Sequence, residues 1–359
     1  MMQEIILATF RIGVEVVLAC VTGGTGFIGS HIVRVLLADG HDVRVLHRAS
    51  SKMTVLEGLS FTSYLGDVTD IESLQKAFSG CDWVFHVAAV ADYWQADNEW
   101  MFAVNVEGTR NVLEAARYAN VKRVIFTSSA ATIGLPTDDT PSDESVAFNL
   151  EPDNFPYGYS KLLAEKVVYE AVEQGQDVVT LNPSIVIGAG DLNLISGTFI
   201  IQIAQSQWLT PLSQGGFGVI DVRDVAASHL AAAKNGRTGE RYILNTQNFT
   251  TAEWFNLIAD VVGVAPPIVT VPKFLLSIVA NIVTGLRRLG IQTPLDANQV
   301  RLGSRYIYFD ACKAQRELHQ PQNDMRQSVQ DTYNWYLAHG YIEKTWYTRL
   351  LQRIGKLIN

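Results

Sequence analysis

The fold is decided by residues 16–29, which read Val16-Val17-Leu18-Ala19-Cys20-Val21-Thr22-Gly23-Gly24-Thr25-Gly26-Phe27-Ile28-Gly29. The apolar run 16–21 predicts a short buried parallel strand. Apolar residues at Ile28, Ile32, Val35 and Leu36 then predict a helix that ends near Gly40. Glycines between a strand and a helix allow a tight turn whose backbone N–H groups face a pyrophosphate. The candidate cofactor-binding residues of this turn are Gly23, Thr25, Gly26, Phe27, Ile28 and Gly29.

The strand–helix alternation continues along the chain. Further strands are predicted at 42–47, 61–65, 82–88, 124–127 and 178–181, and helices are predicted to end at Phe78 and to span 98–118 and 157–172. Alternation of this kind requires right-handed crossovers between parallel strands. The predicted fold class is therefore α/β, a Rossmann-type doubly wound parallel sheet with a smaller, mainly helical C-terminal substrate lobe.

The alternation loosens after Pro183, which suggests a discontinuous second lobe. Residues 219–234 and 242–245 are predicted to return to the core sheet. We expect an N-terminal extension at 1–13 and an NAD(P)-binding Rossmann domain formed by 14–181 and 219–248. The substrate-binding lobe would then comprise 182–218 and 249–359.

Composition narrows the class of protein. With 359 residues, 48% apolar residues and a net charge of -8, disorder is excluded as the dominant state, and the acidic balance argues against a nucleic-acid partner. Three widely spaced cysteines indicate reduced thiols in a cytoplasm, and no cluster has the spacing of a metal site. Residues 274–286 are uncharged but too short for a span of about 20 residues, so no integral membrane segment is expected.

The end of the second predicted strand bears on cofactor choice. It reads His47-Arg48-Ala49-Ser50, with no carboxylate to bind the ribose hydroxyls of NAD. Arg48 and Ser50 suit a 2′-phosphate instead. NADP(H) is therefore the preferred cofactor, and NAD(H) remains open.

Tyr157 and Lys161 are candidates for acid–base chemistry. Their i, i+4 spacing places them on one helix face, where a nearby ammonium and the positive ring of an oxidised nicotinamide would favour phenolate and lower the tyrosine pKa. The strand before this helix ends in Thr127-Ser128-Ser129. Hydroxyls at the carboxyl end of a parallel strand lie where ligands bind, so one serine is predicted to hydrogen bond a substrate oxygen.

Together these motifs resemble the extended branch of the short-chain dehydrogenase/reductase superfamily, the NAD-dependent epimerase/dehydratase family. The resemblance covers residues 15–250 and includes Gly66-Asp67-Val68, His86-Val87-Ala88-Ala89, Asn105-Val106-Glu107-Gly108-Thr109 and Asn182-Pro183-Ser184. His47-Arg48-Ala49-Ser50-Ser51 and residues 221–232 look most like its dihydroflavonol-4-reductase-like group.

The resemblance implies a role for each matching residue. Tyr157 would be the acid–base, Lys161 would hold the nicotinamide ribose, Ser129 would orient the substrate oxygen, and Asn105 would support the site. Cofactor contacts would come from Asp67 and Val68 at the adenine, from Ala88 along the cofactor, and from Pro183, Ser184, Ile185 and Val186 at the nicotinamide. The family also allows a homodimer through the helices predicted at 98–118 and 157–172.

Three functions remain open on this basis. The first is an NAD(P)(H)-dependent ketone or aldehyde reductase, or secondary-alcohol dehydrogenase; the second is a sugar epimerase that retains its cofactor; the third is a non-catalytic NADP-sensing regulator. Ser129 is followed by Ala130 and Ala131 where dehydratases of the family carry Asp-Glu, which argues against dehydration.

Aromatic residues favour an apolar small-molecule substrate. Trp94, Phe155, Phe199 and Trp208 are the candidate substrate contacts, and Tyr93, Trp100 and Phe217 are further members of the same set. Residues 188–218 contain no Arg or Lys, which counts against a sugar diphosphate in this region.

Overall fold

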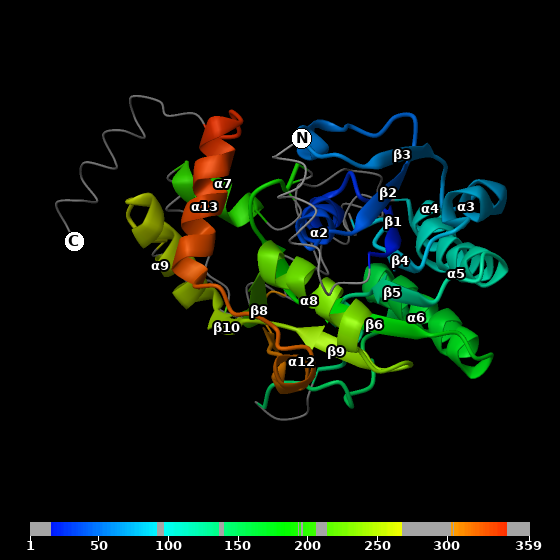
Figure 1. Cartoon of the computed structure of the whole chain (residues 1–359). Coiled ribbons are helices and arrows are strands. Elements are labelled where there is room, and N and C mark those ends of the chain that lie inside the picture. The colour runs from blue at the N-terminus through cyan, green and yellow to red at the C-terminus, as the bar shows by residue number, and fades with distance from the viewer. Residues whose placement is uncertain are drawn as a thin grey trace.

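A computed structural model describes residues 16–91, 97–135, 140–192, 194, 197–205, 214–267, 303 and 305–342. A seven-stranded parallel sheet lies at the centre, with the strand order β3-β2-β1-β4-β5-β6-β9 (Figure 1). Its strands are β1 (Leu18–Thr22), β2 (Asp42–His47), β3 (Thr62–Leu65), β4 (Trp83–His86), β5 (Arg123–Thr127), β6 (Val178–Pro183) and β9 (Arg241–Leu244).

Helices cover both faces of this sheet. Clusters of buried side chains place α2 (Phe27–Ala38) and α8 (Val222–Asn235) on one face. The other face carries α3 (Ile71–Phe78), α5 (Gly108–Tyr118) and α6 (Pro156–Glu173). The predicted doubly wound α/β fold is confirmed, because the chain leaves β1 and β4 in opposite directions across the sheet.

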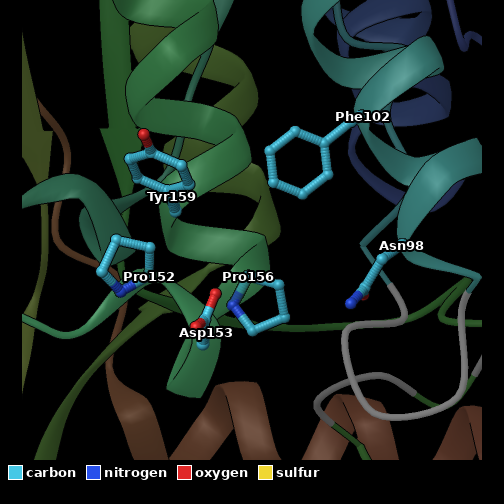
Figure 2. A pocket seen from close by; sticks show the side chains of 6 residues that line it. All are labelled: Asn98, Phe102, Pro152, Asp153, Pro156 and Tyr159. Atoms are coloured by element: carbon cyan, nitrogen blue, oxygen red, sulfur yellow. The ribbon is translucent and has the colours of Figure 1, made fainter.

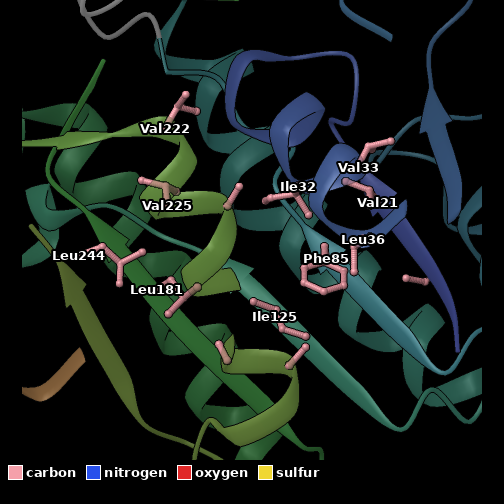
Figure 3. Close-up of a cluster of buried hydrophobic side chains, with 14 of the residues drawn as sticks. Val21, Ile32, Val33, Leu36, Phe85, Ile125, Leu181, Val222, Val225 and Leu244 are labelled. Atoms are coloured by element: carbon pink, nitrogen blue, oxygen red, sulfur yellow. The ribbon is translucent and has the colours of Figure 1, made fainter. Parts of the chain in front are cut away.

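Both faces are packed with aliphatic and aromatic side chains. Figure 3 shows the face beneath α2 and α8, where Phe85 of β4 lies between Leu36 of α2 and Ile125 of β5. Each of these side chains is fully buried. Burial on both faces explains why the strands read as continuous apolar runs rather than as alternating ones.

A second, four-stranded sheet contains β8 (Gly216–Asp221), which pairs with β10 (Gln247–Thr250), β11 (Tyr306–Ile307) and β7 (Ile185–Ile187). The prediction that residues 219–234 return to the core sheet is therefore wrong for residues 219–221, which belong to β8, and right for the residues of α8 (Val222–Asn235). Only α8 packs on the core sheet, whereas Val219 to Asp221 pair with other strands. The apolar run alone could not show which sheet it joins.

The second sheet is accompanied by helices from the C-terminal part of the chain. The helices α7 (Thr198–Ala204), α9 (Thr251–Val262) and α13 (Met325–Ala338) share one buried cluster built around Trp254 and Tyr336. The short helix α12 (Cys312–Glu317) packs beside β9. The helical character predicted after residue 250 is confirmed for α9, α12 and α13.

Several predicted features lie outside the described residues. They are the extension 1–13, the apolar segment 274–286 and the aromatic residues Tyr93, Trp94 and Trp208. Within the described ranges, no helix combines the length and the apolar character that crossing a membrane demands.

Candidate active site

The glycine turn after β1 forms a cradle that tolerates no side chain at Gly23 or Gly29. Gly23 has φ +70°, and a Cβ on it would lie 2.7 Å from the backbone nitrogen of Ala88. A Cβ on Gly29 would lie 2.2 Å from the carbonyl oxygen of Gly23. The helix α2 begins after Gly26 with no side chain capping its first turn. This turn, which also holds Thr25, Phe27 and Ile28, fits the pyrophosphate of a dinucleotide.

The predicted adenine-binding residues lie beside this turn. Because β2 pairs in parallel with β1, Arg48 and Ser50 follow its carboxyl end at the same sheet edge, and both are exposed. Asp67 accepts hydrogen bonds from the backbone and hydroxyl of Thr69, both at 2.9 Å. Val68 is buried against Gly108. A Cβ on Gly108 would lie 2.9 Å from the Val68 side chain.

Ser129 and Tyr157 meet at the end of β5. Ser129 precedes the 3-10 turn Ala130–Thr132, and its hydroxyl is near enough to the Tyr157 phenol to act on the pKa of that group. Burial raises the pKa of Tyr157, and the nearby Ser129 hydroxyl only partly offsets that effect. The protein groups alone therefore do not lower the pKa of Tyr157. The lower pKa expected from the sequence also required the positive ring of an oxidised nicotinamide.

Lys161 lies one turn further along α6 and is 1% exposed. Its Nζ donates to the carbonyl oxygen of Thr127 at 2.7 Å and lies 4.4 Å from the centroid of the Phe126 ring. Burial lowers the pKa of Lys161 to about 7, although the charge of Glu165 acts in the opposite direction. The ammonium is therefore close to its titration point at neutral pH.

Asn105 supports the site through a feature that the sequence did not reveal. The predicted helix 98–118 is interrupted by a π-turn, Ala103–Glu107, between α4 (Asn98–Phe102) and α5. π-turns inside helices are frequent at functional sites. The Asn105 amide exchanges hydrogen bonds with the backbone of Val90 at 2.8 and 3.1 Å and donates to Ser160 Oγ at 3.0 Å. Ser160 in turn donates to the carbonyl oxygen of Tyr157 at 2.8 Å.

A buried polar chain connects Asn105 with the glycine turn. Thr109 Oγ1 donates to the Asn105 carbonyl at 2.7 Å, so it must accept from His86 Nε2, 3.0 Å away. His86 Nδ1 is then the acceptor for the Thr22 hydroxyl at 2.9 Å. That hydroxyl also accepts from the backbone nitrogen of Ala88 at 3.3 Å. His86 is neutral in this arrangement, and burial lowers its pKa to about 3.

The predicted nicotinamide-binding residues follow β6. Pro183 ends the strand, Ser184 donates to the Asn245 side chain at 2.9 Å, and Ile185 and Val186 belong to β7. They connect the two sheets at the edge where Ser129 lies, because β6 is the neighbour of β5. The position fits the expected contact with a cofactor ring.

The candidate substrate residues are not gathered in one place. Phe155 packs against Gly158, which follows Tyr157 on α6. A Cβ on Gly158 would lie 2.5 Å from the Phe155 ring. Phe199 stacks on Phe217 at 6.2 Å between centroids and lies within the cluster of the second sheet. Trp94 and Trp208 lie outside the described residues.

Tyr159, the next tyrosine of α6 after Tyr157, is two residues from Lys161 and therefore projects from another face of the helix. It faces Phe102 of α4 across a pocket of about 390 Å³ that Asn98, Pro152, Asp153 and Pro156 also line (Figure 2). The two ring centroids are 6.2 Å apart. Tyr159 is therefore separate from the Ser129–Tyr157 pair.

Comparison with known proteins agrees with this geometry. The sequence profile of the NAD dependent epimerase/dehydratase family matches residues 19–245. The chain belongs to this family. It is 38% identical, over 90% of its length and 95% of the relative, to a Synechocystis sp. protein provisionally named a dihydroflavonol 4-reductase. It is 30% identical to sterol demethylase protein B of Methylococcus capsulatus, over 90% of this chain and 99% of that protein.

A similar solved structure is that of gox2253, which has a TM-score of 0.82 and 32% sequence identity. The alignment covers 91% of this chain and 99% of that one. The family membership makes this protein a nicotinamide-dinucleotide-dependent enzyme and confirms the resemblance seen in the motifs, including the dihydroflavonol-4-reductase-like group.

Replacing Gly23 with alanine should weaken dinucleotide binding at least about tenfold. The added Cβ would lie 2.7 Å from the backbone nitrogen of Ala88, so the turn or the strand end would have to move. Gly40→Ala is the matched control, since Gly40 also has a positive φ, +88°, but nothing within 4 Å of its Cβ. Both variants should lose stability, and calorimetry should show weakened binding only for Gly23→Ala. Equal affinities in the two variants would contradict the cradle.

Two buried histidines should make the protein less stable in mild acid. Burial lowers the pKa of His86 to about 3 and that of His229 to about 4, whereas both have the ordinary value of 6.5 when unfolded. The unfolded chain therefore binds more protons below pH 6.5, and each histidine should cost about 1.4 kcal/mol per pH unit between pH 6 and 5.

Urea unfolding at pH 7, 6 and 5 measures this loss. His229→Gln should reduce the pH dependence by the contribution of one histidine, because one neutral imidazole is removed. His339→Gln, at the exposed residue that follows α13, should leave the dependence unchanged. A stability that stays flat from pH 7 to 5 would refute the neutral assignment.

Proposed function

We propose that the protein is an NAD(P)(H)-dependent oxidoreductase that interconverts a ketone or aldehyde and the corresponding alcohol. The observation that carries this proposal is the proximity of the Ser129 hydroxyl to the buried Tyr157 phenol, with Lys161 one turn away on the same helix. A bound nicotinamide would supply hydride to the carbonyl carbon or take it from the alcohol.

The residues of the chain would handle the oxygen and its proton. Ser129 would donate a hydrogen bond to the substrate oxygen as negative charge develops on it. Tyr157 would transfer its phenolic proton to that oxygen and become a phenolate. The Lys161 ammonium would stabilise this phenolate, while Asn105 holds the backbone near Val90 and, through Ser160, the start of α6.

The cofactor would be held by the glycine turn and the adjoining strand ends. We propose NADP(H) as the preferred form, because Arg48 and Ser50 are exposed beside the turn and no carboxylate ends β2. Asp67 and Val68 would contact the adenine, Ala88 would lie along the cofactor, and residues 183–186 would border the nicotinamide.

The names of the relatives support a carbonyl on a ring compound. One relative is named for the reduction of a dihydroflavonol, and the other is named for a sterol. Neither substrate is a sugar nucleotide, and no Arg or Lys occurs between residues 188 and 218 of this chain. We propose that residues 182–218 and 249–359 form the substrate lobe, with Phe155 and Phe199 among its contacts.

We further propose a homodimer in the cytoplasm. The helices α5 and α6 expose Tyr118 and Tyr169, which are 71% and 62% accessible, on the side away from the core sheet. Cys20, Cys81 and Cys312 are free thiols, which suits a reducing compartment. Sedimentation equilibrium distinguishes a dimer from a monomer, and a monomer at micromolar concentration would overturn this point.

Tyr157→Phe should reduce turnover of carbonyl substrates about 10³-fold, because it removes the transferable proton. Cofactor affinity should stay within about threefold, since the ring is kept. Tyr159→Phe serves as the control and should retain activity. Steady-state kinetics with calorimetric cofactor binding measures both effects, and undiminished turnover in Tyr157→Phe would refute the mechanism.

Arg48→Ala should weaken NADPH binding about tenfold and leave NADH binding nearly unchanged, because only NADPH carries a 2′-phosphate for the guanidinium. Arg117→Ala, at an exposed position on α5, is the matched control and should change neither affinity.

Mass analysis of any nucleotide released on denaturation separates the competing activities. Exchangeable NADPH indicates a reductase that releases its cofactor at each turnover. Tightly retained NAD would instead indicate an epimerase cycle and overturn the NADP assignment.

A further inference from the structure

Glu165 lies on α6 eight residues after Tyr157 and four after Lys161, so the three side chains share one face of the helix. Its Oε1 lies within hydrogen-bonding distance of three donors: the Ser128 hydroxyl, the Thr132 hydroxyl at 2.8 Å and the Asn182 amide at 2.6 Å. The single Thr132 hydroxyl proton is shared between this oxygen and the Ser129 carbonyl. Its Oε2 faces the Arg241 guanidinium at 3.2 Å. The carboxylate is 12% exposed, which makes this a largely buried ion pair.

The three donors surround the residue that would bind the substrate oxygen. Ser128 and Thr132 flank Ser129 in the chain, and Asn182 comes from the neighbouring strand β6. The Ser129 carbonyl is held at 2.9 Å from the Thr132 hydroxyl and 3.1 Å from the Asn182 amide. Glu165 therefore gathers the groups that fix the backbone of Ser129 opposite Tyr157.

The same carboxylate is the anion that acts on Lys161. Of the other titratable groups that face this ammonium, Tyr157 is a neutral phenol with a raised pKa, and His86 from β4 is neutral. His229 from α8 is also neutral, because burial lowers its pKa to about 4. Its Nδ1 faces the Val225 carbonyl and its Nε2 lies 2.8 Å from Thr127 Oγ1. Among the described residues, the charge that counteracts the effect of burial on the Lys161 pKa thus comes from Glu165.

We propose that Glu165, with Arg241 as its counterion, is a positioning residue that sets Ser129 against Tyr157 and keeps the Lys161 ammonium protonated. Its three hydrogen bonds fix the serine turn, and its charge acts along the helix. The inference deepens the proposed oxidoreductase function, since it assigns a task to a group that touches neither substrate nor cofactor.

The test is a titration of Lys161 in the full-length protein without added ligand. Lysine labelled with ¹³C at Cε reports the charge of each amine, and Lys161→Met identifies the signal. Glu165→Gln removes the anion but keeps the size of the side chain, and should lower the Lys161 pKa by about one unit. Arg241→Gln leaves the carboxylate in place without its cation, and should raise that pKa.

Glu170→Gln is the matched control, because Glu170 lies on the same helix and is 59% exposed. It should leave the Lys161 pKa unchanged. General loosening of the fold would move the pKa in the same direction in both Glu165→Gln and Arg241→Gln. Shifts of the same sign, or an unchanged Lys161 pKa in Glu165→Gln, would therefore overturn the proposal. If Glu165→Gln fails to fold, the sign of the shift in Arg241→Gln decides.

Kinetics supplies the second measurement. Carbonyl reduction needs charged Lys161, so activity should fall as pH rises through the Lys161 pKa, and Glu165→Gln should move this fall to lower pH. A lower rate with an unchanged pH profile would assign Glu165 a structural role only. If the unmodified protein reduces no carbonyl compound, the proposed function fails, while the titration of Lys161 still decides the role of Glu165.

Discussion

The contact between the backbone of Gly23 and that of Ala88 is the constraint on which the rest of the site depends. These residues follow β1 and β4, the strands between which the order of the sheet reverses. Helices leave such a point towards opposite faces, and a crevice remains at the carboxyl edge. A side chain at residue 23 would fill the closest part of this crevice. Parallel strands lie about 4.8 Å apart, so this contact also sets the positions of Arg48 after β2 and Ser129 after β5.

Buried polar groups convert this steric constraint into a rigid arrangement. The chain of hydrogen bonds from Thr22 through His86, Thr109 and Asn105 to Ser160 gives each histidine nitrogen a partner. Such a network is stable in an apolar interior only when its members are satisfied, and it then admits one arrangement rather than several. The π-turn places the Asn105 amide within reach of both Val90 and Ser160. The glycine turn and the start of α6 are therefore positioned by one connected structure.

The strands, the glycine turn and the Tyr157–Lys161 pair could be predicted because each depends on local periodicity or on a fixed spacing. The π-turn at Asn105 could not, since residues 98–118 read as one uninterrupted amphipathic helix. The sheet that β8 joins was also beyond local reasoning, because an apolar strand fits either sheet and long-range pairing with β7 and β10 decides. Glu165 did carry a signal, the continuation of the i, i+4 series from Tyr157 and Lys161. Its meaning depends on Asn182 and Arg241, which are distant in sequence.

The placement of Glu165 resolves a conflict between two requirements of the site. A buried lysine needs an anion to remain charged, but a carboxylate in direct contact with Lys161 would use the positive potential that a phenolate at Tyr157 requires. The carboxylate is instead directed to three hydrogen-bond donors and to Arg241, and Lys161 Nζ donates to the neutral carbonyl of Thr127. The Phe126 ring beneath the ammonium adds attraction without adding a formal charge. Lys161 is thus stabilised from a distance, and its charge remains available to the phenol one turn away.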